Sequence, residues 1–161
     1  TILFLMINNI ETYLTYQNIY LIVNSGVLPL WLMLLFMPNH YLTRFFTNTV
    51  IVPLLLAVTY IFISYKIYLD GSIFEGFSLY IGLDNLYSLF SEESFLLVFW
   101  IHFLSISLFV GGYIARDAQR YLVPRFLCFI SILITYFAGP VGLLLYWFVR
   151  IFFSKKISFN D

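Results

Sequence analysis

The residues best suited to chemistry lie in one apolar stretch of the chain, from Phe99 to Arg150. It contains a histidine, His102, and the polar run Arg116-Asp117-Ala118-Gln119-Arg120. An imidazole among apolar residues can donate a proton, hydrogen-bond a small molecule or contribute one ligand to a metal. The two arginines can hold a phosphate or another polar head group. These residues are therefore the first candidates for catalysis or ligand binding.

Each of these candidates also has a structural interpretation, which we favour on the sequence alone. Histidine often serves as a polar contact between membrane helices, so a neutral His102 bonded to a neighbouring helix is expected. A metal site is not expected, because no second histidine or acidic residue lies nearby in the sequence. Arg116, Asp117 and Arg120 are typical of a collar of charges at a membrane–water interface.

Two interruptions of apolar runs add further candidates. Gly139-Pro140-Val141-Gly142 frees backbone carbonyls that could shape a pocket for an extended apolar ligand, although a simple kink is the preferred interpretation. Asn24 precedes Pro29 and could bond a backbone group that the proline frees. His102 and Arg116 are the candidates for catalysis. The candidates for ligand or lipid binding are Asn24, His102, Arg116, Asp117, Arg120, Tyr136, Gly139 and Pro140.

The composition indicates which environment these residues occupy. The chain has 161 residues, of which 62% are hydrophobic and 10% are charged, whereas a soluble domain carries about 25% charged residues. This balance predicts an integral membrane protein. A net charge of zero gives no reason to expect nucleic-acid binding. The single cysteine excludes a disulfide within the chain, and the absence of nucleotide- or metal-binding motifs predicts no cofactor.

The expected fold is all-α, an integral membrane four-helix bundle with kinked helices. A bilayer core takes about 20 helical residues to cross. We expect an interfacial segment over 1–16, one membrane domain over 17–150 and a short basic tail over 151–161. Residues 71–93 should lie along the membrane surface, and Ser91-Glu92-Glu93 should begin the third membrane helix. The four expected spans are 17–37, 45–65, 94–114 and 126–149.

The third expected helix should turn its polar face toward the other helices, since ionisable groups within a membrane usually face the interior of a bundle. Four spans would place both chain ends on one side of the membrane. The basic residues would then divide evenly between the two sides. The acids would divide seven to one, with Asp117 alone on the second side, which gives only a slight preference for chain ends outside. At 100° per residue, the face of His102 also carries Ser105, Phe109, Gly112, Tyr113, Arg116 and Arg120.

Several of these motifs resemble a membrane-protein family that includes the plant neoxanthin synthase of the abscisic-acid-deficient type. The resemblance covers about residues 17–150 and implies a four-helix membrane protein linked to carotenoid chemistry in plants. The matching pieces are Asn24 with Leu28-Pro29-Leu30-Trp31 and Pro38, Leu42-Thr43-Arg44, Leu89-Phe90-Ser91, Trp100-Ile101-His102, Leu108-Phe109-Val110-Gly111, Ala115-Arg116-Asp117-Ala118, Pro124, and Thr135 with Gly139 through Leu144.

The chain departs from the family at polar positions. Ser107 stands where the family usually has an acid, Gly112 where an arginine often follows the glycine, and Arg125 where a histidine often follows the proline. An acid inside a membrane is energetically costly and is normally kept for a function. Its replacement by Ser107 suggests that this function has lapsed.

Three functions are compatible with the sequence. The preferred one is a catalytically degenerate member that serves as an accessory or structural subunit of a larger membrane complex. The second is a carotenoid (epoxy-xanthophyll) isomerase with His102 as acid and Arg116 as anchor, and the third is a lipid- or pigment-binding module. The expected partners are membrane lipids, other membrane-protein subunits and a carotenoid or polyene. The expected location is a plastid, mitochondrial or bacterial inner membrane.

Overall fold

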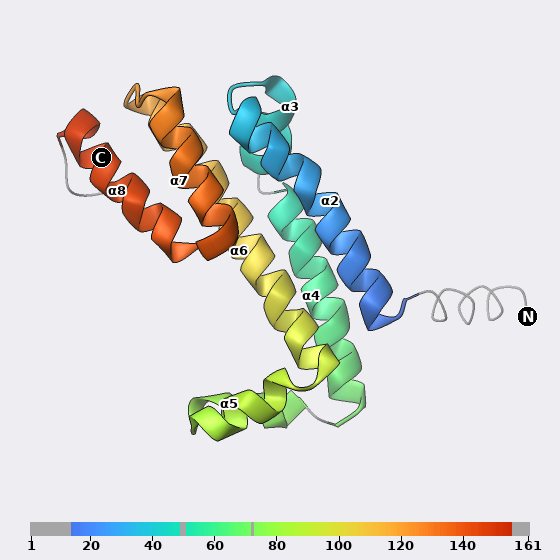
Figure 1. Cartoon of the computed structure of the whole chain (residues 1–161). Helices are drawn as coiled ribbons and strands as arrows, with labels where there is room; N and C mark the ends of the chain where they lie inside the picture. The colour runs from blue at the N-terminus through green and yellow to red at the C-terminus, as the bar shows by residue number, and fades with distance from the viewer. Residues whose placement is uncertain (1–13, 49–50, 72, 156–161) are drawn as a thin grey trace, which may run out of the picture.

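The structure of the protein is a computed structural model that describes residues 14–48, 51–71 and 73–155. All of its regular elements are helical, and no strand occurs within these ranges (Figure 1). Most of the expected interfacial segment 1–16 lies outside the described residues. The helices are α2 (Tyr16–Phe36), α3 (Tyr41–Thr43), η1 (Arg44–Asn48), α4 (Ile51–Leu69), η2 (Ile73–Tyr80), α5 (Leu83–Phe90), α6 (Glu93–Arg120), α7 (Arg125–Ala138) and α8 (Pro140–Ser154).

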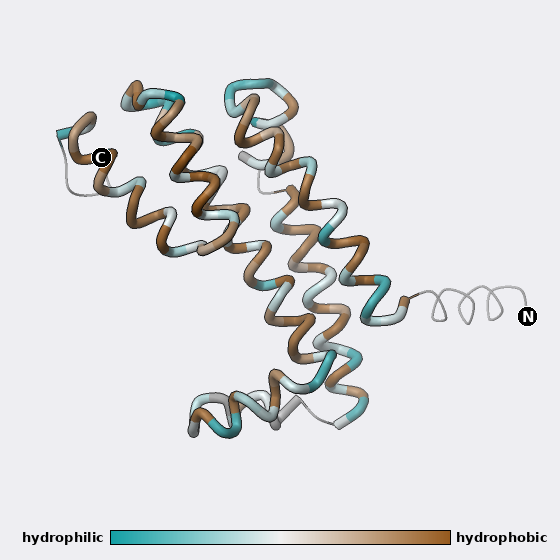
Figure 2. The backbone as a smooth tube through the Cα atoms, in the orientation of Figure 1, coloured by the Kyte–Doolittle hydropathy of each residue, from teal (hydrophilic) through white to brown (hydrophobic). Residues whose placement is uncertain are grey.

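Within the described ranges, three helical runs are long and apolar enough to cross a membrane, namely Tyr16–Phe36, Tyr41–Leu69 and Glu93–Arg120. They contain 21, 29 and 28 residues, and a helix rises 1.5 Å per residue against a bilayer core of about 30 Å. Hydrophobic residues dominate all three runs (Figure 2). These runs contain nearly all of the first three expected spans, and they suggest a membrane protein.

Helix α6 is the centre of the fold, because it packs against α2, α4, α5, α7 and α8. Its buried side recurs every three or four residues and includes several small residues, which let neighbouring helices approach closely. On the α4 side, the Ser105 hydroxyl donates a hydrogen bond to the Pro53 carbonyl over 3.4 Å. The buried side of α6 consists of Leu97, Ile101, Leu104, Ser107, Leu108, Gly111, Gly112, Ile114, Ala115, Asp117 and Ala118.

Helix α2 is joined to α6 by one hydrogen bond and one close packing contact. The Trp100 indole Nε1–H donates to Asn24 Oδ1 over 3.0 Å, so the Asn24 side chain links α2 to α6. The ring of Trp31 covers Gly111, where an added Cβ would come within 2.9 Å of the ring. The glycine therefore admits a large aromatic side chain at the α2–α6 contact.

The expected orientation of α6 is wrong for His102, which is exposed. Its ring lies beside Tyr60 of α4, with 6.2 Å between the ring centroids. Phe109, Arg116 and Arg120 on the predicted face are also exposed, whereas Ser105 and Tyr113 are half-buried and Gly112 is buried. Aliphatic and small residues that neighbour this face in the sequence pack more closely against the other helices. Their packing sets the rotation of α6 about its axis.

The last apolar region forms a helical hairpin instead of the single kinked helix expected over 126–149. Gly139, with φ +35° and ψ −91°, separates α7 from α8, and the chain reverses direction there (Figure 1). A Cβ on Gly142 would overlap the backbone of Thr135, so the first turn of α8 lies directly against α7. With 14 and 15 residues, each helix reaches only about 21–23 Å.

At the N-terminal end of α6, the short helices η2 and α5 lie at a steep angle to the long helices, with η2 against α4 and α5 against α6 (Figure 1). Phe90 packs edge-on against Phe99 at 4.7 Å between centroids. The Ser91 hydroxyl donates to the Tyr87 carbonyl, so Ser91 ends α5 and does not begin α6 as expected. Glu92 instead occupies the N-cap of α6, without a side-chain capping bond.

Candidate functional site

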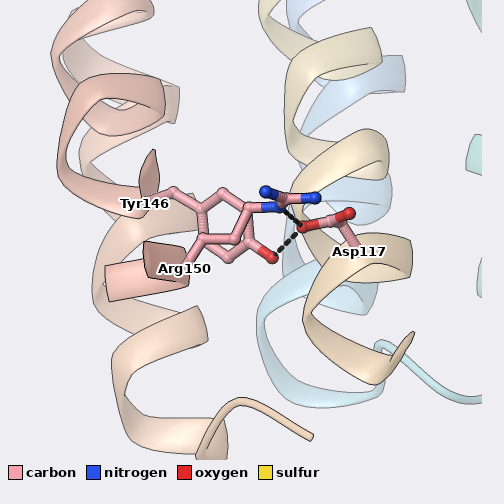
Figure 3. A network of polar contacts seen from close by, with 3 residues as sticks. All are labelled: Asp117, Tyr146 and Arg150. Atoms are coloured by element: carbon pink, nitrogen blue, oxygen red, sulfur yellow. Dashed lines mark hydrogen bonds and ion pairs between the residues drawn. The ribbon is translucent and has the colours of Figure 1, made fainter. Parts of the chain in front are cut away.

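One buried polar cluster joins the C-terminal part of α6 to α8 (Figure 3). Arg150 Nε–H donates to Asp117 Oδ2 over 2.8 Å, and the Tyr146 hydroxyl donates to the same oxygen over 2.6 Å. Arg150 and Tyr146 are 0% exposed and Asp117 is 7% exposed. The Arg150 guanidinium also lies 4.6 Å from the ring centroid of Tyr121. We call Asp117, Tyr146 and Arg150 the buried cluster.

The hairpin brings the buried cluster together. Ser107 Oγ lies 3.5 Å from the position of a Cβ on Gly139, so the hairpin turn packs near the middle of α6. Asp117 follows Ser107 by ten residues, and Arg150 follows Pro140 by ten, so both side chains stand about 15 Å along their helices from the turn. Tyr146 and Arg150 are four residues apart and therefore share one face of α8.

The buried cluster fastens the hairpin to α6. A buried carboxylate that accepts bonds from a guanidinium and a phenol is compensated in charge and in hydrogen bonding. Removing either charged partner would leave the other charge buried and uncompensated. The Asp117 carboxylate is therefore committed to a structural contact, which makes it a poor proton donor or acceptor for a substrate.

The second candidate site is a groove near the N-terminal end of α6, between α4, α6 and the η2–α5 region. Its volume is about 870 Å³.

Aromatic side chains make up most of the groove wall, and His102 lies on it beside Tyr60. No carboxylate lines the groove among the side chains that the structure describes. Hydroxyl and imidazole groups therefore provide its polar contacts. We call it the aromatic groove, and its lining residues are Tyr60, Ser64, Ile67, Tyr68, Gly76, Phe77, Tyr80, Leu89, Phe90, Phe95, Val98, Phe99 and His102.

The structure does not gather the eight candidate residues into one site. His102 lines the aromatic groove and Asp117 belongs to the buried cluster, whereas Arg116 and Arg120 are exposed on α6. Asn24 is bonded to Trp100, and Tyr136 packs edge-on against Trp31 at 5.2 Å between centroids. Gly139 and Pro140 form the hairpin turn. Among the described residues, no group of three His, Cys, Asp or Glu side chains could hold a metal ion.

Sequence reasoning missed Tyr146 and Arg150. Arg150 directly follows the expected span 126–149, and an arginine after a long apolar run is typical of a water interface. The available signal was the four-residue spacing of Tyr146 and Arg150, together with a Gly-Pro pair that can reverse the chain. Only the reversal brings these residues to the level of Asp117.

The described residues form an all-helical structure, and three of their helical runs are long and apolar enough to cross a bilayer, which suggests a membrane protein. The chain belongs to the ABA DEFICIENT 4-like family, whose family model matches residues 18–146. The resemblance inferred from the sequence motifs is thus confirmed. No match was found among curated proteins or solved structures.

Proposed function

We propose that the protein is a multi-pass membrane protein that binds an extended isoprenoid molecule, such as a carotenoid, without converting it. The aromatic groove is the observation that carries this proposal. In this arrangement α2, the run Tyr41–Leu69 and α6 cross the bilayer, and the α7–α8 hairpin enters and leaves from one side. The buried position of Gly139 supports such a hairpin, because irregular backbone at membrane depth has to be covered by protein.

The size and chemistry of the aromatic groove suit this ligand class. Its volume of about 870 Å³ lies within the roughly 300–1,000 Å³ of small-molecule sites. Aromatic rings supply large apolar contact areas, and they pack well against flat, conjugated molecules. His102 and Tyr60 stand together on the wall, where they can hydrogen-bond a polar end group.

Two observations favour binding without conversion. Opening an epoxide to an allene needs an acid at the oxygen and a base at carbon. His102 supplies one such group, but the Asp117 carboxylate is bonded within the buried cluster. Ser107, at the position where the family usually has an acid, is buried against the hairpin turn. These contacts support a catalytically degenerate member of the family.

The test is purification of the protein from cells that make epoxy-carotenoids, followed by extraction and chromatography of any bound pigment. We expect unconverted pigment, reduced at least severalfold by Phe99→Ala and by His102→Ala. Phe126→Ala, which removes an exposed ring outside the groove, is the matched control. Retention of pigment by both groove variants would overturn the proposed site.

Other outcomes distinguish the remaining functions. An allenic product that disappears in His102→Ala would establish the isomerase, for which the pairing of His102 with Tyr60 in the groove is the supporting observation. A protein without pigment that migrates far above 19.0 kDa on a native gel would favour the accessory subunit.

A further inference from the structure

The hairpin concentrates positive charge at one end of the molecule. Because α8 runs back alongside α7, Arg150 and Lys155 lie at the end that also holds the α6–α7 turn and α3 (Figure 1). Lys66 lies near the opposite end, where α4 ends, together with Asp70, Asp84, Glu92 and Glu93. We call the end that holds Arg150 and Lys155 the basic end. Its described basic residues are Arg44, Arg116, Arg120, Arg125, Arg150 and Lys155.

This distribution replaces the even division expected from four spans. Asp117 is the acid at the basic end among the described residues, and its carboxylate is bonded to Arg150. Arg44, Arg120 and Arg125 are exposed there. Positive residues flanking membrane spans favour the cytoplasmic side, where the leaflet surface is negative. The basic end therefore suits contact with anionic lipids.

A slot of about 440 Å³ opens at the basic end between α2, α6 and α7. Its mouth is formed by two turns, at Pro38-Asn39 and Leu122–Arg125, and Gln119 Nε2–H donates to the Pro38 carbonyl over 3.4 Å. Its deeper wall is apolar and includes the buried Leu34 and Ile132. We call this cavity the α2–α7 slot.

The α2–α7 slot has the polarity of a phospholipid site. Arg125 is exposed at the mouth, where it can bond a phosphate. Phe36 of α2 and Phe129 of α7 meet with 5.8 Å between ring centroids, and both rings line the slot. An acyl chain lying against these rings would place its head group beside the arginine.

We infer that the α2–α7 slot binds an anionic phospholipid from the leaflet at the basic end, with its phosphate at Arg125. The inference rests on the membrane insertion in the proposed function but not on the ligand of the aromatic groove. An exposed arginine near an anionic lipid surface contributes about a fivefold preference. A site that also holds the acyl chain should bind the lipid but not free phosphate.

The test uses the purified full chain in detergent with equal amounts of phosphatidylglycerol and phosphatidylcholine carrying the same acyl chains. Native mass spectrometry should show preferential retention of phosphatidylglycerol. Arg125→Gln should reduce the preference about fivefold, and Leu122→Glu should reduce it by repulsion at the exposed mouth of the slot. Arg44→Gln, at the same end but outside the slot lining, is the matched control and should retain the preference.

Three results would overturn the inference. They are equal retention of both lipids by the unmodified chain, an equal loss in Arg44→Gln and Arg125→Gln, and displacement of the lipid by excess inorganic phosphate. Loss of carotenoid binding with the lipid preference intact would count against the groove ligand alone, so the two proposals can fail separately.

Discussion

The buried cluster and the aromatic groove place two ionisable residues of one helix in opposite situations. Asp117 is buried and its carboxylate receives two hydrogen bonds, whereas His102 is exposed and lies against the ring of Tyr60. Burial commits the first residue to holding helices together, because an uncompensated buried charge is unstable. His102 is exposed, so the fold does not depend on compensating its charge. The buried Asp117 is therefore structural, whereas the exposed His102 is available to a ligand.

The largest expected effect comes from breaking the buried cluster. Asp117→Ala leaves the Arg150 charge buried without its carboxylate, which should lower the free energy of unfolding by about 3–5 kcal/mol. Denaturant unfolding in micelles, followed by tryptophan fluorescence, measures this change. The exposed neighbour Arg116→Ala should change it by less than about 0.5 kcal/mol. If Asp117→Ala left the free energy of unfolding unchanged, the buried cluster would not stabilise the fold.

A smaller loss is expected from separating the two helices of the hairpin. Gly142→Ala places a Cβ into the backbone of Thr135, which cannot move aside as a flexible side chain can. We expect a loss of about 1–3 kcal/mol in the same unfolding measurement. Gly26→Ala is the matched control, since its Cβ would meet nothing within 4 Å. Equal stability of the two variants would contradict the close approach of α7 and α8.

A single hydrogen bond between helices should have an intermediate effect. Trp100→Phe removes the donor to Asn24 and should cost about 1 kcal/mol. Asn24→Ala should cost a similar amount, and the double variant should cost less than the sum because both changes remove the same bond. Full additivity of the two losses would show that this bond contributes nothing to stability.

The smallest stability effect is expected at the aromatic groove. His102→Ala should change the free energy of unfolding by no more than about 0.5 kcal/mol, while pigment retention falls. Measuring both quantities on one preparation separates a ligand contact from a structural contact. If His102→Ala lost as much stability as Asp117→Ala, His102 would be a structural residue and the difference between the aromatic groove and the buried cluster would be contradicted.

The positions of the long helices were predictable because uninterrupted apolar length is a strong signal. The rotation of α6 was not, since it depends on the packing of residues such as Gly111 and Ala115 against other helices, and not on the polarity of His102. The hairpin was missed because a Gly-Pro pair in an apolar run is compatible with both a kink and a reversal. The pairing of Asp117 with Arg150 depends on that reversal, so it could not be predicted without it.

In the proposed membrane arrangement, the reversal at Gly139 also determines which side of the bilayer the end of α8 faces. The first residues of α2 lie beside the start of α6, where Tyr16 and Glu93 line a common pocket. The end of α8 lies at the far pole of the molecule (Figure 1). Because the proposed arrangement has three crossings, we expect a reporter fused before α2 and another fused after α8 to lie on opposite sides of the bilayer.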